Sequence, residues 1–233
     1  MSLHIEAKKG EIANTILLPG DPMRAKFVAE NLLEDAVCYN KVRAMYGYTG
    51  NYQGKSVSIQ GSGMGMASVS LYVTELVKEY GVQNLIRVGT CGAIQKDLEI
   101  GQVILVTGAS GDFGANRSYF EGLHYSATSD FSLLLDAYNS AKKLNIDTIQ
   151  GNIFSTDIFY DTSPDRWDKW SEHGILAVEM ETQILLTLGA RFGVRTLSIL
   201  TVSDNIITGE SSTSQAREQS YMDMMKIALD IAK

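Results

Sequence analysis

Asn84-Leu85-Ile86-Arg87-Val88-Gly89-Thr90-Cys91-Gly92 is the stretch on which the fold depends. An apolar run of this length predicts a strand that is buried on both faces. Open α/β sheets bind ligands at the carboxyl ends of such strands, so we expect Arg87 to lie near a ligand. Burying a guanidinium is costly unless an anion meets it. Considered alone, Arg87 fits two interpretations, a structural ion pair and a residue that binds an anionic ligand.

Length and composition indicate one α/β protein of ordinary size. The chain has 233 residues, of which 45% are hydrophobic and 20% are charged, which suffices for one large core. Strand-like and helix-like stretches alternate almost to the end, without internal repeats or a Pro/Ser-rich linker. We therefore predict a single layered α/β domain over residues 1–233.

Charge and cysteine usage narrow the class of partner. A net charge of −7 argues against binding to nucleic acid or to an anionic membrane, so a positive site would be a local cluster of Arg for a small anion. Cys38 and Cys91 form neither a CxxC pair nor a disulfide framework, which suits a reducing cytoplasm. We expect no signal peptide, membrane span, metal or cofactor.

The first predicted strand, residues 15–18, ends at Pro19-Gly20-Asp21-Pro22. A helix should follow, with Asp21 as its N-cap and Pro22 in its first turn. Arg24 lies in that turn, where exposed N–H groups and the helix dipole favour anions. The alternative is an ordinary capped helix whose Arg faces solvent.

Residues 37–60 alternate as antiparallel strands do, with turns expected at Gly50-Asn51 and Gln53-Gly54. Arg43 in this segment has no local explanation. Gly61-Ser62-Gly63-Met64-Gly65-Met66 then leads into a predicted helix over residues 67–80. The loop fails the dinucleotide fingerprint, which argues against NAD, but its glycines allow close approach to a ligand and Met64 offers an apolar contact.

The second half of the chain continues the alternation of elements. Predicted elements are a strand over 101–107, a long loop over 108–125, a helix over 130–144 and a strand over 148–155. Phe159 follows that last strand. An aromatic ring there could stack on a planar base, although such rings more often cover the edge of a core.

Glu179 and Glu181 follow an apolar strand just where a helix over residues 182–192 should begin. A helix dipole tolerates carboxylates at its N-terminus. Alternatively, one carboxylate could accept both hydroxyls of a sugar. A third buried strand, 196–202, ends at Ser203-Asp204-Asn205, and a last amphipathic helix begins between residues 212 and 215.

Arg24, Arg87, Glu181 and Asp204 thus combine an anion clamp, a diol acceptor and a potential acid. With these motifs the sequence resembles the bacterial purine nucleoside phosphorylases of the hexameric, broad-specificity type. The resemblance spans essentially the whole chain, and the segments that carry it are Leu18-Pro19-Gly20-Asp21-Pro22-Met23-Arg24-Ala25, Gly61 to Gly65, Arg87-Val88-Gly89-Thr90-Cys91-Gly92-Ala93, Val178-Glu179-Met180-Glu181 and Thr201-Val202-Ser203-Asp204.

The resemblance implies a three-layer α/β/α fold with a central mixed sheet, and reversible phosphorolysis of purine (deoxy)ribonucleosides to a base and a pentose 1-phosphate. It assigns Asp204 as the acid at N7 of the base and Arg217 as its partner. The other roles it implies are Gly20, Arg24, Arg87 and Thr90 on phosphate; Met64, Met180 and Glu181 on ribose; and Phe159, Val178, Glu179 and Ser203 at the base. A neighbouring subunit of a homohexamer would supply Arg43 to the phosphate and His4 to the 5′-hydroxyl of the sugar.

Two residues depart from the family pattern. Thr90 is more often Ser in the family, and Thr keeps the hydroxyl that phosphate needs. Asn205 is more often His. Because it adjoins Asp204, the resemblance does not fix the base preference or the pH dependence of the reaction.

Rival functions remain at this stage. A nucleosidase of the same fold would use water in place of phosphate. Uridine phosphorylase would keep the arginines but has no use for an N7 acid such as Asp204. A hydrolase using Cys91 would need a paired His, and His4, His124 and His173 stand in no recognisable setting. A non-catalytic nucleoside-binding module is the fourth alternative.

Overall fold

The computed structural model describes residues 2–163, 165–211 and 214–232, and for residues 214–220 it describes the backbone only. Its strands are β1 (Thr15–Leu18), β2 (Glu34–Asn40), β3 (Gly47–Tyr52), β4 (Lys55–Gln60), β5 (Asn84–Ala93), β6 (Val103–Gly111), β7 (Ala127–Thr128), β8 (Thr148–Ser155), β9 (Ala177–Glu179) and β10 (Arg195–Asn205). Its α-helices are α1 (Pro22–Leu32), α2 (Met66–Tyr80), α3 (Gly114–Tyr119), α4 (Phe131–Lys143), α5 (Asp168–Glu172), α6 (Thr182–Phe192) and α7 (Ser214–Asp230).

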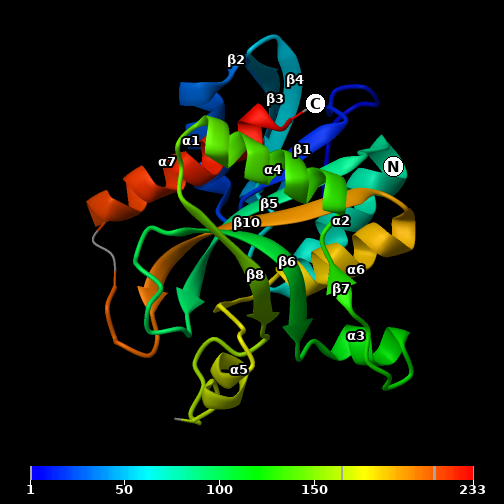
Figure 1. Cartoon of the computed structure of the whole chain (residues 1–233). Coiled ribbons are helices and arrows are strands. Elements are labelled where there is room, and N and C mark those ends of the chain that lie inside the picture. Colours follow the sequence, from blue (N-terminus) through cyan, green and yellow to red (C-terminus); the bar gives the residue numbers. More distant parts are fainter. Residues whose placement is uncertain (1, 164, 212–213, 233) are drawn as a thin grey trace.

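Helices cover both faces of a central mixed sheet, as expected (Figure 1). The alternation of side chains in β1 shows why: Leu17 packs into a core with α1, α4 and α7, whereas Ile16 and Leu18 pack into a second core with α2 and α6. Successive residues of a strand point to opposite faces. The continuous apolar run of β1 is therefore explained by burial on both sides, which confirms the α/β prediction.

Five strands of the sheet close into a ring in the order β5, β10, β6, β8, β9 and back to β5. Strands of the ring contribute Ile104, Ile153 and Leu200 to a third apolar core. One edge of β5 changes partner on the way: β1 pairs with it as far as Arg87, and β9 pairs with it from Gly92. Residues 88–91 therefore lie at a switch of strand order, a place where α/β sheets bind ligands.

Helix α1 begins as its sequence predicts. Asp21 is the N-cap, and its Oδ1 accepts a hydrogen bond from the backbone N–H of Met23 at 2.8 Å. Pro22 opens the helix, where its missing N–H costs nothing. Helix α6 has the predicted bounds and ends at Gly193, which has a φ of 68°. A left-handed residue at this position is the common end of a helix.

Two local predictions are wrong. The segment 108–125 is not one long loop, because β6 continues to Gly111 and α3 follows it. Pairing of β6 with β7 and β8 extends that strand through its glycines. The turn expected at Gly50-Asn51 also lies inside β3, where both residues pair with β4, while the turn at Gln53-Gly54 is confirmed.

Candidate active site

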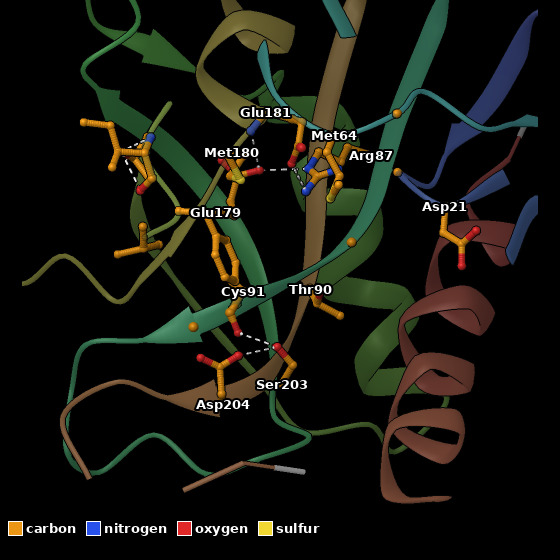
Figure 2. Close-up of a pocket in the computed structure, with 18 of the residues that line it drawn as sticks. Asp21, Met64, Arg87, Thr90, Cys91, Glu179, Met180, Glu181, Ser203 and Asp204 are labelled. Atoms are coloured by element: carbon orange, nitrogen blue, oxygen red, sulfur yellow. Dashed lines mark hydrogen bonds and ion pairs between the residues drawn. The ribbon is translucent and has the colours of Figure 1, made fainter. Parts of the chain in front are cut away.

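A cavity of about 890 Å³ opens where β5 changes partner, beside the carboxyl end of β10. The loops after β1, β4 and β8 also reach it, as does the N-terminus of α6. Residues from distant parts of the chain thus line one space (Figure 2). Those predicted from the sequence are Gly20, Arg24, Met64, Arg87, Thr90, Phe159, Val178, Glu179, Met180, Glu181, Ser203 and Asp204.

Arg87 is 5% exposed and forms ion pairs with two carboxylates. Its Nε lies 2.9 Å from Oε2 of Glu179, and its Nη2 contacts Oε2 of Glu181. Burial alone would lower the pKa of Arg87, but the charges of Glu181 and Glu179 raise it. Gly89 leaves room for the guanidinium, because a Cβ there would lie 2.8 Å from Cζ of Arg87. Arg87 is thus both a partner in a structural ion pair and a lining residue of the cavity.

The two carboxylates at the start of α6 have different surroundings. Glu179 accepts hydrogen bonds from the backbone N–H groups of Glu181 and Thr182, which are orphan donors of the helix start. Glu181 reaches across the cavity, where its Oε1 accepts from the N–H of Gly65 at 2.6 Å. Burial and the neighbouring Glu179 raise the pKa of Glu181 despite the attraction of Arg87. The helix-dipole interpretation therefore fits Glu179, and Glu181 is placed to meet a ligand.

The loops after β1 and β4 pack on each other and bring Arg24 to the cavity. The N–H of Gly63 donates to the carbonyl of Gly20 at 3.0 Å. A Cβ on Gly61 would lie 2.8 Å from Pro22, so only glycine permits this approach. The guanidinium of Arg24 lies 4.1 Å from the ring centroid of Tyr221 on α7. Its burial lowers its pKa, against the attraction of Tyr221 and Asp21.

Asp204 lies near the end of β10, at a register shift between Val202 and Asp204 opposite β5. Its Oδ1 accepts a hydrogen bond from Oγ of Ser203 at 2.7 Å, and Ser203 Oγ also lies 3.3 Å from the carbonyl oxygen of Cys91 (Figure 2). Gly92 makes room for the acid, since a Cβ there would lie 2.9 Å from Oδ2 of Asp204. The half-buried carboxyl group thus has one oxygen fixed while it lines the cavity.

Asn205 turns away from Asp204. It is 2% exposed, and its Nδ2 donates to the carbonyls of Gln95 and Leu98. Its Oδ1 accepts from the N–H groups of Ile207 and Thr208. This side chain fastens two loops and does not line the cavity, so its position favours a role in loop structure.

The loop after β8 contributes several residues to the cavity lining. Phe159 on this loop is 73% exposed and lines the cavity together with Ile158. The loop is tied back to the end of β6 by Arg166, whose guanidinium pairs with Asp161 and Asp112. The aromatic ring of Phe159 is therefore presented by a fastened loop and is not part of the core edge.

Two predicted residues, His4 and Arg43, do not line this cavity within the described part of the chain. His4 pairs with Glu75 at 2.7 Å and lies edge-on to the ring of Tyr72. Arg43 is exposed, with a left-handed backbone at φ 56° and ψ 23°, and it opposes the increase in the pKa of Tyr72 that burial causes. Arg217 belongs to α7, but its side chain lies outside the described residues.

Comparison with known proteins places this geometry in a family. A profile of the Phosphorylase superfamily matches residues 14–233. The chain belongs to the phosphorylase superfamily. It is 56% identical over 233 residues to a DeoD-type purine nucleoside phosphorylase of Alkaliphilus metalliredigens and 54% identical over 232 residues to one of Caldanaerobacter subterraneus subsp. tengcongensis, with complete coverage of both chains in each case. A relative of the same name from Bacillus cereus is 53% identical, with 100% and 99% of the two chains covered.

In this member of the phosphorylase superfamily, sequence reasoning missed one buried polar residue of the site. Ser155 at the end of β8 is fully buried, and its Oγ lies 2.5 Å from Oε1 of Glu179. It also accepts from the N–H of Gln183 at 2.9 Å. The available signal was a serine at the end of a predicted strand, where polar side chains of α/β proteins often serve a site.

Cys91 lines the cavity of this phosphorylase superfamily member, but its surroundings do not favour a nucleophile. The thiol is 3% exposed, and burial raises its pKa above the ordinary value. A reactive cysteine needs the opposite shift.

No group of three His, Cys, Asp or Glu side chains in the described ranges is arranged to hold a metal. In the same residues, no helix has the length and apolar character that crossing a bilayer requires.

Proposed function

We propose that this protein catalyses the reversible phosphorolysis of purine (deoxy)ribonucleosides, giving a free purine base and a pentose 1-phosphate. The observation that carries the proposal is a single cavity that holds buried guanidinium and carboxyl groups at one end and the carboxyl group of Asp204 at the other. Full-length relatives named as purine nucleoside phosphorylases support it.

Each end of the cavity could stabilise one of the two charges that develop during the reaction. Cleaving an N-glycosidic bond builds positive charge on the sugar and negative charge on the base, so an anion near the sugar and a proton donor at the base both lower the barrier. Phosphate would lie against Gly20, Arg24, Arg87 and Thr90 and would attack C1′ of the sugar. Asp204 would give its proton to N7 of the leaving base, with Ser203 fixing one oxygen of the carboxyl group.

The sugar and base have candidate partners between those ends. Glu181 would accept the ribose hydroxyls, with Met64 and Met180 against the sugar, because carboxylates bind diols through charge-assisted hydrogen bonds. Phe159 and Val178 would contact the base. Arg217 would approach Asp204 when α7 closes over the filled site, and its approach would favour the ionised acid and so promote proton transfer.

We also propose that each site is shared between subunits of a homohexamer. His4 and Arg43 both lie near Tyr72, and neither lines the cavity of its own chain. The strained backbone at Arg43 supports a functional use for its exposed guanidinium. In a symmetric dimer the same face of each subunit can complete the partner's site. The protein would work in the cytoplasm, where Cys38 and Cys91 stay reduced.

One assay tests the proposal against its rivals. Base release from adenosine, inosine and uridine is measured with and without inorganic phosphate, and we expect phosphate-dependent release from the two purine nucleosides. Equal release without phosphate would indicate a nucleosidase, and a preference for uridine would indicate a uridine phosphorylase. Tight binding without turnover would indicate a binding module.

A further inference from the structure

Glu179 accepts so many hydrogen bonds from the protein itself that little acceptor capacity is left for a ligand. Its Oε2 accepts from Nε of Arg87 and from the N–H groups of Glu181 and Thr182, at 2.9 to 3.0 Å. Its Oε1 accepts from Oγ of Ser155 at 2.5 Å and shares the N–H of Thr182 at 3.0 Å. A carboxylate offers about four lone-pair sites. The chain itself thus uses the acceptor capacity of Glu179, whose side chain is 1% exposed.

These contacts hold Glu179 from two elements. Ser155 at the end of β8 links the carboxylate to α6, because its Oγ also accepts from the N–H of Gln183. The start of α6 supplies two backbone donors and the positive end of its dipole. A carboxylate with this many fixed donors has one position, so it can serve as an anchor for Arg87.

The contact of Glu179 with Arg87 is made through Nε, at the base of the guanidinium plane. Binding there fixes the direction of the terminal Nη groups. Nη2 contacts Glu181, which itself lines the cavity and accepts from Gly65 on the loop after β4. Gly89 lets the guanidinium lie against the strand without a Cβ in the way. Arg87 therefore has one fixed carboxylate, Glu179, and one that faces the ligand space, Glu181.

We propose that Glu179 is a positioning residue that fixes Arg87 while the Arg87–Glu181 ion pair opens toward the two substrates. Phosphate takes the Nη groups of Arg87, and the ribose hydroxyls take Glu181. Glu179 itself touches neither substrate, in contrast to the base-contacting role that the family resemblance implies. This inference rests on the proposed function, in which Arg87 binds phosphate and Glu181 binds ribose.

The direction in which Glu179→Gln changes phosphate binding depends on whether Glu179 acts through its charge or by holding Arg87 in place. Ionised Glu179 and Glu181 together carry one more charge than Arg87 neutralises. Removing the charge of Glu179 would by attraction alone make phosphate bind more tightly. Loss of an anchor has the opposite effect, because Arg87 can then turn toward Glu181 and leave the phosphate position. Glu179→Gln therefore distinguishes positioning from a simple contribution to the electrostatic field.

The experiment measures binding of inorganic phosphate alone, by calorimetry, so that contacts with a nucleoside play no part. We expect Glu179→Gln to weaken phosphate binding by about tenfold or more, since charge-assisted hydrogen bonds between Arg and phosphate depend on the orientation of the guanidinium. Ser155→Ala, which removes one anchor of Glu179, should weaken it several-fold. Ser198→Ala is the matched control: Ser198 is fully buried and pairs with Oγ1 of Thr182 at 2.9 Å, without contacting Glu179.

Unchanged or tighter phosphate binding in Glu179→Gln would overturn the inference, and so would equal losses in Ser155→Ala and Ser198→Ala. If Glu179→Gln does not fold, the pair of serine variants decides the matter alone. Arg87→Ala is measured in parallel to separate the two proposals. Full phosphate binding by Arg87→Ala would overturn the proposed role of Arg87 on phosphate, whereas loss there with no effect at Glu179 or Ser155 would overturn only the positioning role of Glu179.

Discussion

The two ends of the cavity are built in different ways. At the anion end, formed by Arg24, Arg87, Thr90 and Glu181 with Glu179 behind them, Arg87 and both glutamates are buried and form ion pairs with one another. At the base end, formed by Ser203, Asp204 and the loop with Phe159, side chains are half-buried or exposed. Charges fixed in a low-dielectric site need no reorganisation during the reaction. The difference teaches that charged groups are fixed by buried contacts at the anion end, whereas the side chains of the base end are held less tightly.

Asp204→Asn should have the largest effect, because it removes the proposed proton donor while keeping the size of the side chain. We expect a loss of about 10²- to 10⁴-fold in kcat/KM on inosine, as is typical of general acids. 7-Methylguanosine supplies the control, since its imidazole ring is already cationic and its base leaves without protonation. The variant should retain a much larger fraction of activity on it. Equal losses on both substrates would mean that Asp204 holds the site together and is not the acid.

Arg87→Ala breaks the anion end. We expect at least a thirtyfold loss of kcat/KM, about 2 kcal/mol of transition-state stabilisation, because a charge-assisted hydrogen bond is lost in a buried site. Arg195→Ala is the matched control. Arg195 also belongs to the sheet, at the start of β10, where its Nε donates to Asn84 at 2.7 Å, and it does not line the cavity. A folded Arg87→Ala protein with unchanged phosphate dependence would remove Arg87 from the anion site.

Subunit mixing tests whether Arg43 of a second chain completes the anion end. Arg43→Ala and Asp204→Asn proteins are each expected to be weakly active. In random dimers, roughly a quarter of the sites would combine an intact Asp204 with an intact Arg43 from the neighbour. Activity should therefore rise on mixing. No gain, with subunit exchange verified, would show that Arg43 is not supplied in trans.

The sequence was sufficient to predict the elements whose signals are local. The bounds of α6 and the capped start of α1 follow from periodicity and from Asp21-Pro22. The ring of strands and the extension of β6 through Gly108 and Gly111 depend on pairing with β7 and β8. Strand stability comes from such neighbours more than from residue preference, so composition alone suggested a loop.

In the candidate site too, features with a local sequence signal could be predicted, whereas features that depend on tertiary contacts could not. Polar residues at strand ends, such as Arg87 and Asp204, could be predicted because ligands bind at that edge of an α/β sheet. Their partners could not be predicted in the same way. Glu179 lies 92 residues from Arg87 along the chain, and Ser155 joins them only through the packing of β8 against β9. Contacts of this kind depend on tertiary structure.

Arg166→Met should have the smallest effect and sharpens the contrast between the two ends. Arg166 pairs with Asp161 and Asp112, and its Nη2 donates to Oγ1 of Thr156 at 3.0 Å. These contacts fasten the loop that presents Phe159. Partly exposed ion pairs contribute about 0 to 1 kcal/mol each, so loosening the loop should raise the KM for nucleosides by roughly three- to tenfold.

The KM for phosphate should stay unchanged in Arg166→Met, because the anion end is fixed by buried contacts that do not involve this loop. Arg191→Met is the matched control: its guanidinium lies 5.2 Å from the ring centroid of Tyr119, and it does not line the cavity. Steady-state kinetics with each substrate varied in turn separates the two constants. Equal rises in both constants would show that the two ends are coupled through the loop, which contradicts their independent construction.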